Sequence, residues 1–169
     1  MAAPTDRSAE VFRLHPAVLW ISIFFALLLQ TFLPVKVPMA RLLDFPLLVV
    51  IYFSLVRRHK VFGTVLGTAL GLVQDALAHG FIGMFGMAKA LVGYLAASAS
   101  VRFDIEPVLT RSVMTGVFVF LHSVCLLGLQ HGLLESPPPF RALEMGSSIL
   151  SNTAMGLILF QVLDRFKQQ

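Results

Sequence analysis

The chain has 169 residues, of which 57% are hydrophobic and only 13% are charged, and its mean hydropathy is +0.82. A soluble domain carries about 25% charged residues, so the composition excludes a water-soluble globular domain, and the wealth of apolar side chains excludes a disordered chain. The single cysteine, Cys125, excludes an internal disulfide framework. The net charge of +4 indicates a membrane topology signal and does not indicate nucleic-acid binding.

Six apolar segments follow one another along the chain, and each is a candidate for a membrane helix, which needs about 20 mostly apolar residues. They cover residues 17–33, 45–56, 61–78, 81–100, 108–129 and 143–163. We expect the first to be a retained anchor, because no small-residue cleavage site follows it. Little is left besides short loops and tails. The sequence therefore predicts an all-α integral membrane protein, with residues 1–169 forming a single bundle of six transmembrane helices.

The second segment is shorter than the others. Its helix either begins before Asp44 or crosses a locally thinned membrane. Asp44, with Pro46 just after it, is typical of a helix start, because an Asp side chain caps free backbone N–H groups and Pro is favoured in the first turn.

The distribution of Lys and Arg predicts the orientation. With both termini in the cytoplasm, nine of these residues lie inside and three lie outside, and Lys89 falls within a span. The inside set is Arg7, Arg13, Arg57, Arg58, Lys60, Arg102, Arg111, Arg165 and Lys167, and the outside set is Lys36, Arg41 and Arg141. Such a bias follows the positive-inside rule. The basic turn of Arg57, Arg58 and Lys60 either only fixes the topology or also binds anionic lipid or a cytoplasmic partner.

Small residues mark packing faces on the third and fourth segments. Gly63, Gly67 and Gly71 form a tandem GxxxG stripe with Asp75 on the same face. Such stripes let two helix backbones approach closely in lipid. The fourth segment carries a second stripe, in which Gly86 and Gly93 alternate with alanines, and only residues 78–80 separate the two segments. We therefore expect an antiparallel hairpin.

Two ionisable residues fall within this hairpin. We expect Asp75 and Lys89 to pair, because the Lys89 stem leans toward the N-terminal end of its helix and thus toward Asp75. An intramembrane charge is a functional candidate by default. The pair either locks the hairpin or serves as a proton relay or polar ligand site. His122, within the fifth segment, is expected to be a hydrogen-bonded residue of the bundle.

The sequence carries no motif of a known catalytic or phosphate-binding site. The five histidines are scattered without metal-ligand spacing, and no carboxylate pair stands at short helical spacing inside a span. We therefore expect no enzyme, no cofactor and no metal site.

Residues 41–95 resemble the bacterial rod shape-determining protein MreD family. The resemblance rests on Asp44 at the start of a short apolar helix, the basic turn after it, the run from Gly67 through Gly71 to Asp75, and then Gly83 and residues 93–95 (Gly-Tyr-Leu). It implies a six-span fold similar to the substrate-binding subunits of energy-coupling-factor transporters.

The resemblance also implies a function. The implied function is that of a scaffold in the inner membrane of a bacterium, within the elongation machinery that controls peptidoglycan synthesis and cell shape. The implied partners are the single-pass protein MreC, through its transmembrane helix, and in the wider complex the filament protein MreB, RodA and its transpeptidase partner. The residues expected to serve in partner binding or helix packing are Gly63, Gly67, Gly71, Asp75, Gly83, Gly86 and Gly93. Two alternatives stay open: a small-molecule-binding subunit of a transporter, and a proton-coupled carrier.

Overall fold

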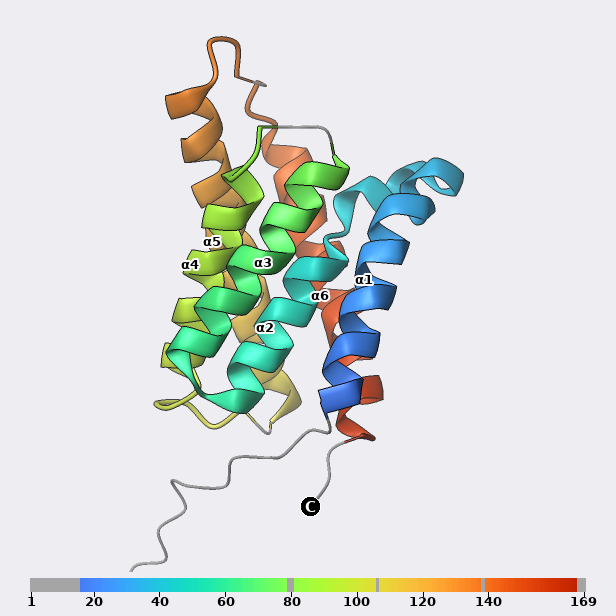
Figure 1. Cartoon of the computed structure of the whole chain (residues 1–169), viewed down its shortest axis with the longest axis vertical. Helices are drawn as coiled ribbons and strands as arrows, with labels where there is room; N and C mark the ends of the chain where they lie inside the picture. The colour runs from blue at the N-terminus through green and yellow to red at the C-terminus, as the bar shows by residue number, and fades with distance from the viewer. Residues whose placement is uncertain (1–15, 79–80, 106, 138, 167–169) are drawn as a thin grey trace, which may run out of the picture.

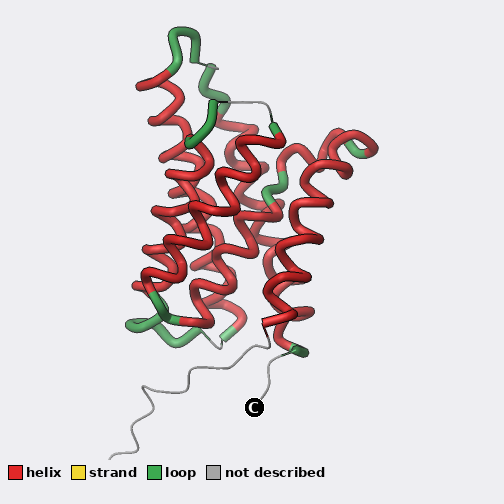
Figure 2. The backbone as a smooth tube through the Cα atoms, viewed as in Figure 1, coloured by secondary structure: helices red, strands yellow, loops and turns green. Residues whose placement is uncertain are grey.

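A computed structural model describes residues 16–78, 81–105, 107–137 and 139–166 (Figure 1). Six α-helices and one short 3-10 helix make up this part of the chain (Figure 2). They are α1 (Pro16–Lys36), η2 (Pro38–Leu42), α2 (Phe45–Arg57), α3 (Lys60–Leu77), α4 (Met84–Ala99), α5 (Val108–Leu133) and α6 (Ala142–Asp164). The prediction of an all-α chain with six helices is confirmed.

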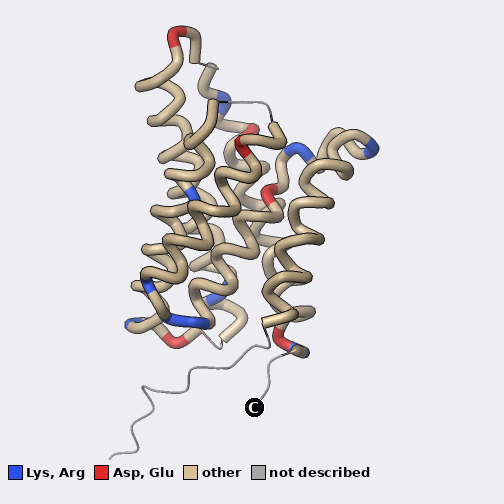
Figure 3. Tube along the Cα trace, in the orientation of Figure 1, with Lys and Arg blue, Asp and Glu red and all other residues tan. Residues whose placement is uncertain are grey.

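The helices run alternately up and down, so that α1 begins and α6 ends at the same end of the bundle (Figure 1). The α2–α3 and α4–α5 connections lie at that end, and η2, the α3–α4 connection and the α5–α6 connection lie at the other. Acidic and basic residues gather near the two ends, with few between them (Figure 3). Arg7, Arg13 and Lys167, which contribute to the predicted charge bias, lie outside the described residues, as do residues 79 and 80 of the predicted turn.

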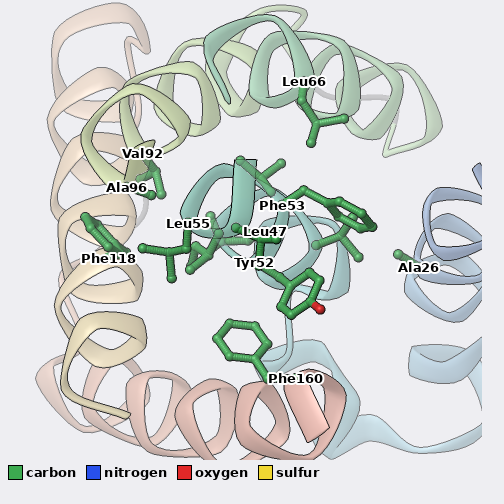
Figure 4. Packing of buried hydrophobic residues seen from close by; sticks show 14 of the residues in the cluster. Ala26, Leu47, Tyr52, Phe53, Leu55, Leu66, Val92, Ala96, Phe118 and Phe160 are labelled. Atoms are coloured by element: carbon green, nitrogen blue, oxygen red, sulfur yellow. The ribbon is translucent and has the colours of Figure 1, made fainter. Parts of the chain in front are cut away.

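Helix α2 occupies the centre of the bundle. All of its residues except Arg57 are buried. Its Leu47, Tyr52, Phe53 and Leu55 meet side chains from each of the other α-helices (Figure 4). Those neighbours are Ala26, Leu66, Val92, Ala96, Phe118 and Phe160. A helix that is apolar all round is a buried helix, and α2 accordingly contacts each of the other five α-helices.

The start of α2 agrees with the prediction. Asp44 is its N-cap, and the carboxylate accepts a hydrogen bond from the Leu47 N–H at 3.0 Å. The helix therefore begins at Phe45 and not before Asp44, and η2 precedes it.

The helices differ in how well they match a bilayer. Helices α1, α5 and α6 are long and apolar enough to cross a membrane, and α2 and α4 are apolar but shorter. Helix α1 is the least buried of the three long ones, with 11% of its apolar window inside the bundle. Large apolar side chains such as Trp20, Phe24 and Phe32 are more than half exposed on it. Such a surface is typical of a helix that faces lipid or a membrane partner.

Helices α3 and α4 make the closest contact in the molecule, through glycine. A Cβ on Gly67 would lie 2.6 Å from the carbonyl carbon of Lys89, and one on Gly93 would lie 2.6 Å from the carbonyl carbon of Gly63. At Gly71 a Cβ would come within 2.5 Å of Gly86 Cα. The stripe of Gly63, Gly67 and Gly71 is thus the inner face of the α3–α4 hairpin, where no larger residue fits.

Candidate functional site

Asp75 ties the end of α3 to the beginning of α4. Its carboxylate accepts hydrogen bonds from three backbone N–H groups, those of Gly83 at 2.9 Å, Phe85 at 3.1 Å and Gly86 at 3.2 Å. These donors are free because they precede or open the first turn of α4. A carboxylate at a helix N-terminus also complements the helix dipole. Asp75 is only 2% exposed, so it joins the two helices as an internal cap.

Gly83 makes that cap geometrically feasible. Its φ of +108° lies in a region that L side chains rarely adopt, although a Cβ there would meet no atom within 4 Å. The glycine is therefore required for its backbone conformation and not for close packing.

The predicted pair of Asp75 and Lys89 is wrong. Lys89 Nζ instead forms an ion pair with the Asp44 carboxylate at the start of α2. The physical reason is that backbone amides already satisfy Asp75, while Lys89, one turn deeper in α4, points to the centre of the bundle where Asp44 caps α2. Lys89 is fully buried and the Asp44 side chain is 15% exposed, so each charge offsets the cost of burying the other.

His122 of α5 completes a buried polar cluster with this pair. Its Nε2 lies 3.5 Å from Lys89 Nζ and 4.0 Å from Asp44 Oδ2. The ring of Phe85 stacks on the imidazole, with 6.1 Å between centroids. We call Asp44, Lys89 and His122 the central cluster. It joins α2, α4 and α5, and no group of three potential metal ligands occurs among the described residues.

Polar side chains of α1 and α6 hold the η2–α2 junction from both sides. Asn152 Oδ1 accepts from the Asp44 N–H at 2.8 Å, and Asn152 Nδ2 donates to the Leu42 carbonyl at 2.7 Å. From α1, Gln30 Oε1 accepts from the Phe45 N–H at 3.0 Å. The backbone of the junction, irregular between η2 and α2, is thus satisfied inside the protein, as a membrane requires.

A polar cavity of about 230 Å³ lies beside the central cluster. It is lined by residues of η2 and of all six α-helices, and its polar lining includes Arg41, Asp44, Gln74, His122, Ser148 and Asn152. Neither Asp75 nor Lys89 lines it. These lining residues place the cavity in the half of the bundle nearer to η2 and the α3–α4 connection (Figure 1).

The basic turn between α2 and α3 is tightly built. Arg58 has a left-handed φ of 53° as the C-cap of α2, and His59 caps α3 by accepting the Phe62 N–H at 3.2 Å. The Arg57 guanidinium lies 4.2 Å from the centre of the Phe62 ring, and Lys60 Nζ lies 5.7 Å from that of Tyr94. Arg57 and Lys60 therefore pack partly on aromatic rings.

A second polar link lies at the same end of the bundle. Arg111 of α5 pairs with Asp164 of α6, and Tyr52 of α2 donates a hydrogen bond to Asp164 at 3.0 Å. The Arg111 Nε also donates to the Ile105 carbonyl. Sequence reasoning missed this link, because its three side chains come from three separate helices.

Comparison with known proteins gives one result that bears on identity. No curated protein and no solved structure matches the chain. The family model for rod shape-determining protein MreD matches residues 12–163. Because the match spans nearly the whole chain and covers all the helices except the last residue of α6, the protein belongs to the MreD family.

Proposed function

We propose that this chain is a non-enzymatic scaffold of the rod shape machinery in the bacterial inner membrane. It binds MreC and helps to regulate peptidoglycan synthesis and cell shape, with MreB, RodA and its transpeptidase partner in the wider complex. The observation that carries the proposal is the MreD family match over residues 12–163. The all-helical architecture, with little chain outside the bundle, supports a protein that works through helix faces and short loops.

The proposed topology has both termini in the cytoplasm. Two observations support it. Among the described residues, Arg57, Arg58, Lys60, Arg102, Arg111 and Arg165 belong to the end of the bundle where α6 ends, against Lys36, Arg41 and Arg141 at the other. Helix α1 also begins at the end of the bundle where α6 ends. Short loops with a positive excess stay in the cytoplasm. The turn of Arg57, Arg58 and Lys60 then lies at the cytoplasmic lipid surface, where a basic patch attracts anionic lipid.

The partner helix must use a face other than the glycine stripe. Gly63, Gly67 and Gly71 pack directly on the backbone of α4, so no second helix can reach them. Of the three long helices, α1 has the smallest share of its apolar window buried in the bundle. Lipid tails are as apolar as leucine, so helix association in lipid depends on close packing. A partner helix is therefore expected to bind a grooved face in preference to a smooth one.

Such a groove lies between α1 and α6, with α2 as its floor. It has a volume of about 240 Å³, and its lining is almost entirely apolar. Ile21 and Phe25 come from α1, Val49 from α2, and Leu159 and Val162 from α6. We propose that the transmembrane helix of MreC lies along this groove.

Affinity purification of the detergent-solubilised protein from its native membrane, read by mass spectrometry, tests the scaffold. We expect an MreC-like protein in near-equal amount. Gly67→Leu should abolish recovery by disrupting the bundle, whereas Gly128→Leu, at a site where a Cβ meets no atom within 4 Å, should leave it intact. Absence of an MreC-like protein from the wild-type sample would contradict the proposal.

A second candidate function is the small-molecule-binding subunit of a membrane transporter. The polar cavity of about 230 Å³ beside the central cluster favours it. This function requires an energising ATPase, so the same purification discriminates between the two: recovery of an ATPase pair without MreC would favour transport.

A further inference from the structure

The polar cavity has features that the scaffold function does not use. A cavity lined by the buried side chains of Gln74 and His122 is costly inside a membrane bundle unless its polar groups are satisfied. Most of them are: Ser148 and Asn152 both donate to the Leu42 carbonyl, and Asp44 pairs with Lys89. Two lining groups, on Gln74 and Arg41, remain.

The first is the side-chain amide of Gln74. Gln74 is 7% exposed, and its Oε1 is buried with no hydrogen-bond partner within the described structure. A buried acceptor left unpaired costs about 1–3 kcal/mol, so a native protein keeps one where something else supplies the donor. Gln74 lines the cavity, and a donor placed there would reach it.

The second is the guanidinium of Arg41 in η2. Arg41 is an exposed residue that also lines the cavity, and among the described residues its guanidinium has no ion-pair partner within 4.0 Å. Asp44 and Lys89 neutralise each other, so Arg41 leaves the site with one positive charge in excess. A guanidinium presents a planar fork of donors that fits a carboxylate or a phosphate.

We propose that this cavity binds one small anionic molecule, with its carboxylate or phosphate on Arg41 and a hydroxyl or amine donor on Gln74. At about 230 Å³, the cavity is below the usual range of about 300–1,000 Å³ for drug-sized ligands, so it takes a small molecule or the headgroup of a larger one. A phosphate ester meets these needs and comes from two sources, a phospholipid headgroup or a soluble metabolite. The proposal holds whether or not MreC binds the α1–α6 groove, because that groove shares neither Arg41 nor Gln74.

Calorimetric titration of the detergent-purified protein with sn-glycerol 3-phosphate tests the site. We expect one molecule to bind per chain, and Arg41→Gln to weaken binding by about ten- to a hundredfold through loss of a charged hydrogen bond. Gln74→Leu should weaken binding by about fivefold or more. Lys36→Gln is the matched control, because Lys36 is an exposed cation at the same end of the bundle that does not line the cavity.

Native mass spectrometry of the same samples identifies the source. A phospholipid retained by the wild type and by Lys36→Gln, but lost from Arg41→Gln, would identify a lipid headgroup. Binding of glycerol phosphate without a retained lipid would identify a soluble phosphate ester. Neither Arg41 nor Gln74 Oε1 makes a hydrogen bond that its substitution would remove, so we expect both variants to fold, which a single symmetrical peak in size-exclusion chromatography checks. No binding by the folded wild type would overturn the proposal. Equal affinity in wild type, Arg41→Gln and Gln74→Leu would also overturn it, because the ligand would then bind without these two residues.

Discussion

Replacing Gly67 by alanine places one methyl group in the α3–α4 contact. That methyl would lie 2.6 Å from the Lys89 carbonyl carbon and 2.9 Å from the Ala90 nitrogen. Both are backbone atoms of α4, so no side-chain rotation relieves the clash. Ordinary contact begins at 3.4 Å, and the Lys89 carbonyl oxygen lies closer to the methyl than either of these atoms, so the two helices must separate locally by more than 0.8 Å.

The energetic consequence follows from two opposing effects. Overpacking costs about 1–3 kcal/mol, and the separation also loosens the glycine contacts one turn away at Gly63 and Gly71. Alanine gains about 1 kcal/mol of helix propensity over glycine. At Gly128 of α5 a Cβ meets nothing within 4 Å, so that position shows the propensity gain alone. Both variants gain the same helix propensity, so Gly67→Ala should be less stable than Gly128→Ala by the overpacking cost alone, about 1–3 kcal/mol.

Thermal unfolding in detergent, followed by the loss of a monodisperse peak in size-exclusion chromatography, measures this difference. A chain of this size loses about 2–4 °C of unfolding midpoint per kcal/mol, so the two variants should differ by roughly 2–12 °C. Gly67→Ala that unfolds at the same temperature as Gly128→Ala would refute the close backbone contact between α3 and α4.

Four further substitutions test the Asp75 cap, the Asp44–Lys89 pair and the backbone of Gly83. Asp75→Asn should destabilise the protein by about 1–3 kcal/mol, because an amide cannot accept all three N–H groups; unchanged denaturant unfolding would contradict its role as a cap. Lys89→Met should cost about 3–5 kcal/mol by leaving Asp44 unpaired, and Asp44→Asn in the same chain should restore part of that loss; strictly additive losses in the double-mutant cycle would argue against the pair. Gly83→Ala should cost about 1–3 kcal/mol through its positive φ alone, and a normal unfolding midpoint would show that the loop relaxes freely.

Local features of the chain predicted much of the fold. Six apolar segments predicted six helices, Asp44 and Pro46 predicted the start of α2, and the short connection after Ala78 predicted the α3–α4 hairpin. All of these depend on residues close together in the sequence. The continuous apolar run of the second segment was also a signal for a central helix, although its shortness suggested a thinned membrane instead.

The partners of the buried polar groups could not be predicted in the same way. Lys89 and Asp44 are 45 positions apart in the sequence. Asn152, whose side chain accepts a hydrogen bond from the Asp44 N–H, lies 108 positions from Asp44. Sequence spacing made Asp75 the nearest carboxylate to Lys89, but it did not show that the amides of Gly83, Phe85 and Gly86 would satisfy Asp75 first. Hydropathy identifies the apolar segments, but it does not show which polar side chains meet. The packing of α2 against every other α-helix decides which polar groups come together.

Photo-crosslinking in the native cell tests the central claim, that MreC binds the face between α1 and α6. A photoreactive phenylalanine analogue at Phe25, which lines the groove and is 55% exposed, should crosslink to the transmembrane helix of MreC. The same analogue at Phe120 of α5, which is 45% exposed and does not line the groove, should give no such product. MreC captured from Phe120 and not from Phe25 would move the interface to another face, and no MreC product from any helix face would contradict the scaffold.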